Sequence, residues 1–513
     1  MVSEILKLCM SKGFLLDKEM LGLLESLTGE GARKIIEALG NLGVEERILT
    51  KKLFMAKFEN LKHLLTMDEG DYKVKSFFRA MGYVEPKVAE EAREGRVKII
   101  SSKSFTPRKI GVSDFVNHYR SRFEVLKGVL ELGGYDDLTS LRKLGFDRGN
   151  YTVIVSVVGK RITKNKNLLL EVEDLTGNSV VLVNQNRPKL FKKASELLLD
   201  DIVAFRVSGN KDMLFADELI FPEAKLKGKR SSDFEEYVAF SGDFHAGSTM
   251  FLEENLRRFV KWLNGNLGSE EERNLAMKVR YLFLLGDSVD GVGHYLGQEK
   301  HLFEKTILGQ YEKVSDILKL IRDDVQIIMC PGQHDAVWVG EPQPVIPKKY
   351  APGLYEMENL HLVANPATVE IDGGFKVLMY HGASINRMID ELPEIRTKFG
   401  HLNPSRVVKE MVKRRHLAPT HGAMDYIPCE KGDPLVISPV PDIIATADQH
   451  RAEFNEKNNI TLVTSSCWQS MTPFEEKVGN VPDPCKVPLL NLKTREKKIL
   501  DFSGDGVEVN DES

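Results

Sequence analysis

The chain has 513 residues, of which 42% are hydrophobic and 28% charged, so it can bury the cores of about three globular domains. Its 71 basic and 75 acidic residues leave a formal net charge of −4, which gives no global signal for nucleic-acid binding. No apolar run of about 20 residues predicts a membrane span, no signal peptide is recognisable, and five scattered cysteines favour a cytoplasmic location over a disulfide framework.

The first part of the chain is predicted to form a small helical module over residues 1–70, because its apolar residues recur at the spacing of a helix face. Residues 71–112 are rich in Lys, Arg, Glu and Ser, which predicts a linker. An amphipathic helix is expected over 113–132, where apolar residues recur along one stripe. We assign this helix to the domain that follows, residues 113–225.

The rest of this second domain has the periodicity of β-strands. The expected order is three strands, a helix over 189–198 and two further strands. Such an order within about 75 residues suggests a Greek-key barrel of the OB type. OB barrels often bind single strands by stacking bases on aromatic side chains, but these strands carry only Tyr151, Phe205 and Phe215. A protein-docking or purely structural barrel is therefore an equal alternative.

A third domain is expected over 233–505, where hydrophobic strands alternate with helices as in an α/β fold. Ten of the twelve histidines lie between His245 and His450. Five of the six strands expected here end in Asp, His or both. Because the carboxyl ends of strands in such a sheet meet at one edge, these side chains are expected to gather there.

The residues expected at this edge are of metal-binding and proton-transferring types. They are Asp243, His245, Asp287, Gln333, His334, Asp335, His381, Asp448 and His450. The set is large enough for two divalent ions about 3.5–4 Å apart with a bridging carboxylate, an arrangement that cleaves phosphoesters. Mixed carboxylate and imidazole ligands suit Mn, Fe or Zn better than Mg or Ca. Each motif alone has an ordinary explanation as a turn or cap, but their joint order favours a metal site.

These motifs resemble the signature of the calcineurin-like metallophosphoesterases. In this chain they stand as "DFH" at 243–245, "GDSVD" at 286–290, "GQHD" at 332–335, His381 and "ADQH" at 447–450. Over about 113–502 the chain resembles more closely the small subunits of the archaeal D-family DNA polymerase. The stretches that carry this resemblance are "DFVNHYRSRF", "EVEDLTGNSVVLVN", "GDSVDGVG", "HDAVWVGEPQP", "KRRHLAPTHG" and "PDPCKVPLLNLKT".

The resemblance implies an α/β metallophosphoesterase sandwich, an all-β OB barrel and a small helical N-terminal module. It implies a 3′→5′ exonuclease that proofreads single-stranded or primer–template DNA for a separate large catalytic polymerase subunit, with no membrane partner. Two divalent ions are implied, Mn first and Fe or Zn as alternatives. Metal 1 would be bound by Asp243, His245, Asp287 and His450, and metal 2 by Asp287, Gln333, His381 and Asp448.

The resemblance also implies that His334 assists the leaving 3′ oxygen and is oriented by Asp335. Gln333 and Asp448 depart from the family pattern, which has Asn and His there, and both fall on metal 2. A weakened or inactive scaffold subunit, similar to the B subunits of eukaryotic replicative polymerases, is therefore an alternative. A phosphatase of small phosphoesters is a second alternative, in which the barrel has no role.

A local basic segment offers a path for the DNA backbone. The same residues are equally explained as the solvated face of an amphipathic helix, and both explanations can hold together. The residues expected to contact DNA are Arg406, Lys409, Lys413, Arg414 and Arg415.

Overall fold

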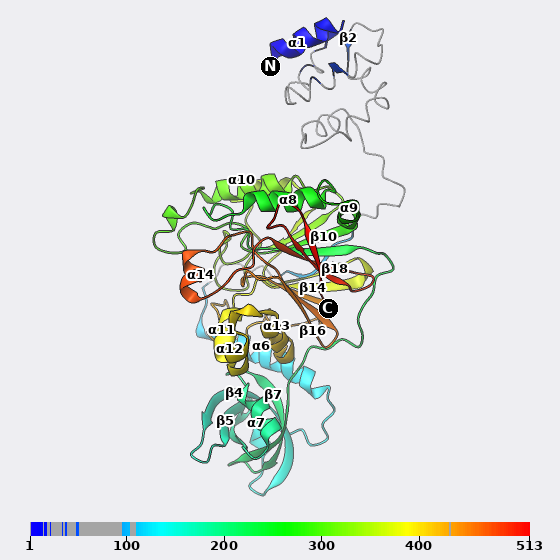
Figure 1. Cartoon of the computed structure of the whole chain (residues 1–513). Helices are drawn as coiled ribbons and strands as arrows, with labels where there is room; N and C mark the ends of the chain where they lie inside the picture. The colour runs from blue at the N-terminus through cyan, green and yellow to red at the C-terminus, as the bar shows by residue number, and fades with distance from the viewer. Residues whose placement is uncertain are drawn as a thin grey trace. The chain divides into compact units, whose positions relative to one another are not determined.

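The computed structural model describes residues 2–13, 15–17, 21, 33, 36–37, 48–50, 95–102, 109–429 and 432–512. The chain divides into two compact units, Met1–Arg93 and Glu94–Ser513. In the first unit the described elements are helix α1 (Val2–Ser11) and the parallel strands β1 (Leu15–Leu16) and β2 (Ile48–Leu49) (Figure 1). Most of the helical module expected over 1–70, and the expected linker up to residue 94, lie outside the described residues.

The second unit contains a closed barrel of five strands, preceded by helix α6 (Val112–Glu131). The strands follow one another around the barrel in the order β4-β5-β6-β8-β7, and only the β6–β8 pair is parallel. Alternate side chains of each strand fill the interior, as the period of two requires. The elements are β4 (Gly149–Ile162), β5 (Leu168–Asp174), β6 (Gly177–Val183), α7 (Pro188–Ser195), β7 (Ile202–Gly209) and β8 (Leu214–Ile220).

The remainder of the second unit is built on two mixed sheets that face each other (Figure 1). The seven-stranded sheet has the order β12-β11-β10-β9-β18-β19-β20, and the six-stranded sheet has the order β16-β17-β15-β14-β13-β3. The strands of the first sheet are β9 (Tyr237–Ser241), β10 (Val279–Leu285), β11 (Gln326–Cys330), β12 (Leu360–Leu362), β18 (Lys486–Asn491), β19 (Lys497–Asp501) and β20 (Glu508–Glu512). Those of the second are β3 (Lys98–Ser102), β13 (Ala367–Ile371), β14 (Phe375–Met379), β15 (Ile443–Thr446), β16 (Glu453–Lys457) and β17 (Ile460–Thr464).

Helices cover the outer face of each sheet, so the domain is a sandwich of four layers. Along β10, Leu282 and Leu284 face the core under the first group of helices, whereas Phe283 and Leu285 face the core between the sheets. Beside the seven-stranded sheet lie α8 (Glu253–Leu263), α9 (Glu270–Met277) and α10 (Ile307–Leu318). The remaining helices are α11 (Ile385–Glu391), α12 (Pro393–Lys398), α13 (Ser405–Arg414) and α14 (Pro473–Val478).

Strand β3 differs from the expectation for this part of the chain. Residues 98–102 fall within the linker expected over 71–112, yet they pair antiparallel with β13 at the edge of the six-stranded sheet. The local sequence is short and half-exposed, so its pairing depends on a partner more than 260 residues away, which local periodicity does not reveal. Among the described residues, no helix combines the length and apolarity needed to cross a membrane.

Buried ion pairs hold the barrel and α6 against the sandwich. Arg122 on α6 donates from Nε to Asp433 at 2.6 Å, and Asp433 also accepts from His416 Nε2 at 2.8 Å. On the other side, Arg414 at the end of α13 lies with its Nε 3.1 Å from the carboxylate of Asp201, which precedes β7. Each of these carboxylates is buried and paired, as a buried charge must be.

Candidate metal centre

The polar residues predicted from the sequence follow parallel strands of both sheets. Asp243 and His245 follow β9, and Asp287 follows β10, whose residues pair in parallel with β9 and β11. His381 follows β14, and Asp448 and His450 follow β15. The two sheets therefore bring their carboxyl-terminal loops to one place. Within it, one ligand atom from each of three residues lies within 4.8 Å of the others in three overlapping groups, Asp243–His245–His450, His245–Asp287–His334 and Asp243–Asp287–His381.

The backbone of this site is held in an uncommon conformation. Five of its residues have a positive φ, which is rare for residues other than glycine. They are Asp243 (50°), His245 (50°), Asp287 (48°), Asp448 (66°) and His450 (56°). Such strain costs on the order of 1–3 kcal/mol per residue and persists where the surroundings over-determine it, often at functional sites. Gly286 (φ 96°) allows the tight turn before Asp287, because a Cβ there would lie 2.6 Å from His381 Nδ1.

Three histidines are oriented through their Nδ1 atoms, which leaves Nε2 directed into the site. His381 Nδ1 donates to the carbonyl of Leu285 at 2.7 Å, and His450 Nδ1 bonds to Glu475 at 2.7 Å. The Asp290 carboxylate lies 3.3 Å from His245 Nδ1. Partners of this kind fix the tautomer and the ring orientation of metal-binding histidines. In each case Nε2 is the nitrogen left to bind a cation.

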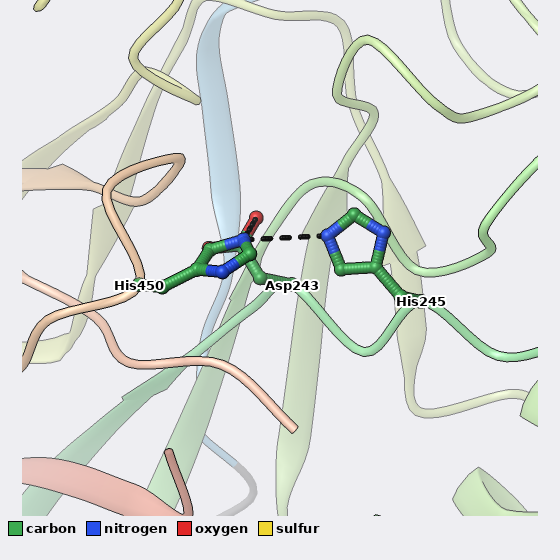
Figure 2. Close-up of side chains that lie close together, drawn as sticks. All are labelled: Asp243, His245 and His450. Carbon is green, nitrogen blue, oxygen red and sulfur yellow. Dashed lines mark hydrogen bonds and ion pairs between the residues drawn. The ribbon is translucent and has the colours of Figure 1, made fainter. Parts of the chain in front are cut away.

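His245 and His450 face each other with their Nε2 atoms 3.4 Å apart, and Asp243 lies beside them (Figure 2). A carboxylate bonds His450 Nδ1 and another lies 3.3 Å from His245 Nδ1 without hydrogen-bond geometry, and with the proton on each Nδ1 both Nε2 atoms offer lone pairs to the space between the rings. Two lone pairs at this distance need a proton or a cation between them. A cation at this point would also contact Asp243 Oδ1, which is buried and has no hydrogen-bond partner among the described residues.

The second half of the site centres on Asp287 and His381. His381 Nε2 lies 3.2 Å from Asp287 Oδ2 and 3.7 Å from Asp448 Oδ1. The His381 Nε2 atom is also buried and makes no hydrogen bond with another described residue. These residues therefore also fit a cation. Asp243 belongs to both halves by distance, whereas the sequence analysis assigned it to metal 1 alone.

Burial and neighbouring charges shift the pKa values of these carboxylates in opposite directions. Burial raises the pKa of Asp243 to about 7, against the effects of His450 and His381. Burial would also raise the pKa of Asp287, but His381, His334 and His245 hold it below its ordinary value. Asp287 is thus the carboxylate best suited to stay ionised between two cations.

His334 lies in the site, but Asp335 does not orient it as expected. The His334 Nδ1 donates to the backbone carbonyl of Asp290 at 2.8 Å, and its backbone N–H donates to Asp287 Oδ1 at 2.8 Å. The Asp335 carboxylate accepts instead from Tyr311 (2.8 Å), from the Gly332 N–H (2.8 Å) and from the hydroxyl of Ser288. Asp335 therefore shapes the turn beneath the site. Burial would lower the pKa of His334, but Asp287 and the Asp290 carbonyl raise it above its ordinary value.

The two residues that depart from the family pattern are held differently. The Asp448 carboxylate accepts from Gln449 Nε2 at 2.7 Å, and its other oxygen is the one near His381. The Gln333 side chain makes no hydrogen bond with another described residue and is partly exposed. A hydrogen bond therefore holds Asp448 at the site, whereas Gln333 has no such bond to another described residue.

Two carboxylates that contact the histidines were not assigned from the sequence. Asp290 belongs to the quoted "GDSVD" motif, and it accepts from Gln298 Nε2 at 2.9 Å as well as facing His245. Glu475 is the third residue of α14 and forms a capping box with Thr472. The capping-box pattern Thr-x-x-Glu was visible in the sequence, but nothing local links it to His450.

The basic segment expected to contact DNA is largely engaged within the protein. Arg414 is 2% exposed and pairs with Asp201 and Glu410, so it cannot reach a DNA backbone. The prediction for Arg414 was wrong because its partners come from other places in the fold. Asp201 belongs to the barrel segment, and Glu410 lies one turn earlier in α13. Lys413 lies 3.0 Å from Glu410, and the Arg406 guanidinium lies 3.9 Å from the Phe399 ring centroid. Lys409 and Arg415 are partly exposed.

Comparison with known proteins gives consistent matches. Residues 238–455 match the family model for the B subunits of DNA polymerases alpha and epsilon. The DNA polymerase II small subunit of Methanothermobacter thermautotrophicus is 36% identical over 411 residues, covering 79% of this chain and 82% of that protein. The proteins of the same name from Pyrococcus furiosus (30% identical, 94% of this chain, 83% of that protein) and Archaeoglobus fulgidus (34%, 79% and 80%) match similarly. Among solved structures, Vps29 from Cryptosporidium parvum matches 55% of this chain and 98% of its own, with 14% identity and a TM-score of 0.27.

Proposed function

The chain belongs to the family of archaeal DNA polymerase II small subunits, and on this premise we propose that it is a metal-dependent 3′→5′ exonuclease. It proofreads for a large catalytic polymerase subunit and removes mismatched nucleotides from a primer strand. Within this proposal, residues 113–225 form the barrel domain and residues 233–505 the phosphodiesterase domain. We take the barrel to be of the OB type, which its strand order and the position of α7 between β6 and β7 support.

The observation that carries this proposal is the gathering of imidazole and carboxylate ligand atoms around two adjacent points, one of which has the unpartnered Asp243 Oδ1 and the other the unpartnered His381 Nε2. Asp243, His245 and His450 would hold one divalent cation, and Asp287, His381 and Asp448 the other, with Asp243 and Asp287 placed to serve both. Bound there, two such cations would supply Lewis acidity toward the phosphate and lower the pKa of a water. Manganese suits this mixture of imidazole and carboxylate, with iron or zinc as alternatives.

The residues of the chain then have distinct tasks. The carbonyl of Asp290 holds the Nδ1–H of His334, so that Nε2 is the nitrogen free to give a proton to the departing 3′ oxygen. The raised pKa of His334 favours the protonated form that this transfer needs. Asp290 and Glu475 orient His245 and His450, and the Leu285 carbonyl orients His381.

One observation favours the scaffold alternative. Gln333, the ligand expected for metal 2, is partly exposed and stands where the family pattern has the shorter Asn, so this ion has a departing ligand at two positions, Gln333 and Asp448. A chain that has lost its second ion would still join the large polymerase chain without cleaving DNA. The same experiment distinguishes the two functions.

The test is release of the 3′-terminal nucleotide from single-stranded DNA and from a mismatched primer–template, with Mn²⁺ and with EDTA. We expect Mn²⁺-dependent release, faster at a mismatch. His334→Ala should slow it by about 10²–10⁴-fold, the usual contribution of a general acid. His361→Ala is the matched control, because this histidine lies on β12 and bonds only Gln326 among the described residues. If no preparation, alone or with the large subunit, cleaves DNA, the protein is a scaffold.

A further inference from the structure

The loop that follows Asp290 brings a further histidine, His294, against His334. The two rings have centroids 4.6 Å apart and planes inclined at 31°. The ring of His245 also contacts His334, edge-on, with centroids 4.8 Å apart and planes at 79°. His334 is itself partly exposed, so the protein core alone does not fix its ring, and these two neighbouring rings contribute to its position.

The buried side chain of Gln298 fixes the backbone of His294. Its Oε1 accepts from the His294 backbone N–H at 2.9 Å. Its Nε2 donates to the Asp290 carbonyl at 3.0 Å and to Asp290 Oδ2 at 2.9 Å. Because Gln298 is 1% exposed, water does not compete for these bonds. The amide therefore ties His294 to the residue whose carbonyl accepts from His334 Nδ1.

These contacts form a closed cycle around His334. The Asp290 carbonyl bonds its Nδ1 at 2.8 Å, Gln298 joins Asp290 to His294, and the His294 ring returns to the His334 ring. Gly291, with a φ of 75°, makes room for this packing. A Cβ there would lie 2.2 Å from His294 Nε2 and 2.6 Å from the His334 carbonyl oxygen. One hydrogen bond fixes a single atom of an imidazole, whereas a packed neighbouring ring also fixes its tilt.

Two simpler explanations of His294 disagree with these contacts. As a metal ligand it would have to meet the carboxylates, but among the residues that the structure describes, none of the three groups of ligand atoms contains it. As a surface histidine without a role it would need neither a buried amide on its backbone nor a glycine beneath its ring. His294 is exposed, so its contact with His334 is not a by-product of core packing.

We propose that His294 is a positioning residue of the exonuclease reaction, which holds the His334 imidazole so that its Nε2 points at the departing 3′ oxygen. The inference rests on the proposed function, in which His334 gives the proton. The 3′ oxygen keeps the electron pair of the broken phosphorus–oxygen bond and takes the proton from Nε2. Since a misplacement of about 1 Å can cost about 10²-fold in rate, a residue that only holds the donor can still matter to catalysis.

The first test compares two substrates whose leaving groups differ in their need for a proton. They are single-stranded DNA and the p-nitrophenyl ester of thymidine 5′-monophosphate, hydrolysed by the full-length protein with Mn²⁺, alone and with the large subunit. p-Nitrophenolate leaves as a stable anion, so a general acid contributes little to its release. We expect His294→Ala to lower kcat on DNA by about 10–100-fold with KM little changed, and to hydrolyse the ester at the wild-type rate. His334→Ala should show the same pattern more strongly, whereas Asp287→Ala should lose both activities.

Two further variants separate positioning from folding. His294→Phe keeps a flat ring against His334 and should retain more of the DNA rate than His294→Ala. His301→Ala is the matched control, because His301 is the next histidine along the chain and its ring contacts Tyr295, with centroids 6.3 Å apart, rather than His334. It should cleave both substrates like the wild type. His294→Ala should keep the wild-type melting temperature, because the residue is exposed.

A second measurement does not depend on cleavage. In protein labelled with ¹⁵N-histidine and kept in EDTA, the Nδ1–H of His334, held by the Asp290 carbonyl, should give a signal that exchanges slowly with water and is missing in His334→Ala. We expect His294→Ala to lose this signal and His301→Ala to keep it. The proposal is overturned if His294→Ala keeps either the signal or the wild-type rate on DNA, or if it slows DNA and ester equally. Failure of the wild type to cleave either substrate would instead overturn the exonuclease function itself, and the reaction role of His294 with it.

Discussion

Replacing Glu475 by Gln tests how the metal centre is held without touching a ligand. The Glu475 carboxylate contacts His450 Nδ1 at 2.7 Å, and its other oxygen accepts from the backbone N–H and the hydroxyl of Thr472 at 3.0 and 2.9 Å. Gln preserves the capping box, which tolerates either residue. An amide has only one acceptor oxygen, so a Gln that still accepts from Thr472 turns its NH2 toward His450, which then loses both the negative charge and the acceptor for its Nδ1–H.

The size of the effect follows from this geometry. A carboxylate that orients a metal-binding histidine contributes about 10–100-fold in metal affinity, or roughly 1.4–2.7 kcal/mol. We therefore expect Glu475→Gln to lower the affinity for the ion at Asp243, His245 and His450 by that factor. The affinity for the ion at Asp287 and His381 should stay nearly unchanged. Calorimetric titration with Mn²⁺ should resolve the two events.

Glu476→Gln is the matched control, since Glu476 is the exposed neighbour on α14 and touches none of the ligands. It should titrate like the wild type. Equal Mn²⁺ affinities for Glu475→Gln and Glu476→Gln would refute the reasoning, and would mean that the Glu475–His450 contact does not support the metal site. If Glu475→Gln lowered the affinity for both ions equally, α14 would have shifted as a whole.

Further predictions concern the second ion, the buried ion pair and the response to pH. Gln333→Asn with Asp448→His should raise Mn²⁺-dependent cleavage more than either change alone, because both shape one coordination sphere; a fall in rate would show that the wild-type pair is tuned to another ion. Arg414→Met should cost about 3–5 kcal/mol by leaving buried Asp201 unpaired, visible as a lower melting temperature that Arg415→Met does not reproduce. His416 has its pKa lowered to about 4 by burial and by Arg122, and its Nδ1 accepts from the Ala418 N–H at 3.0 Å. Because the folded pKa lies below the unfolded value of about 6.5, stability should fall from pH 6.5 to pH 4, by up to about 3 kcal/mol in total. His416→Asn should flatten the melting temperature over that range, and an unchanged slope would contradict this assignment.

The sequence predicted the features that depend on local pattern. Strand periodicity followed by Asp or His identified the edge at which Asp243, Asp287, His381 and His450 meet, because parallel strands place their carboxyl ends together. The strand–helix–strand order likewise indicated a five-stranded barrel before its closure was known.

The features that depend on distant partners could not be predicted. Strand β3 forms only against β13, and Arg414 is buried only because Asp201 of the barrel segment meets α13. Asp335 follows His334 directly and was the residue expected to orient it, but neighbouring residues of a turn point apart. The carbonyl of Asp290, 44 residues earlier in the chain, makes that contact instead.

The central claim is that the metal centre is intact, and anomalous X-ray scattering from crystals soaked in Mn²⁺ tests it most directly. We expect two anomalous peaks about 3.5–4 Å apart, one beside His245 and His450 and one beside His381, with Asp287 contacting both. No peak, or a single peak beside His245 and His450 that persists at saturating Mn²⁺, would contradict the account and support the scaffold function.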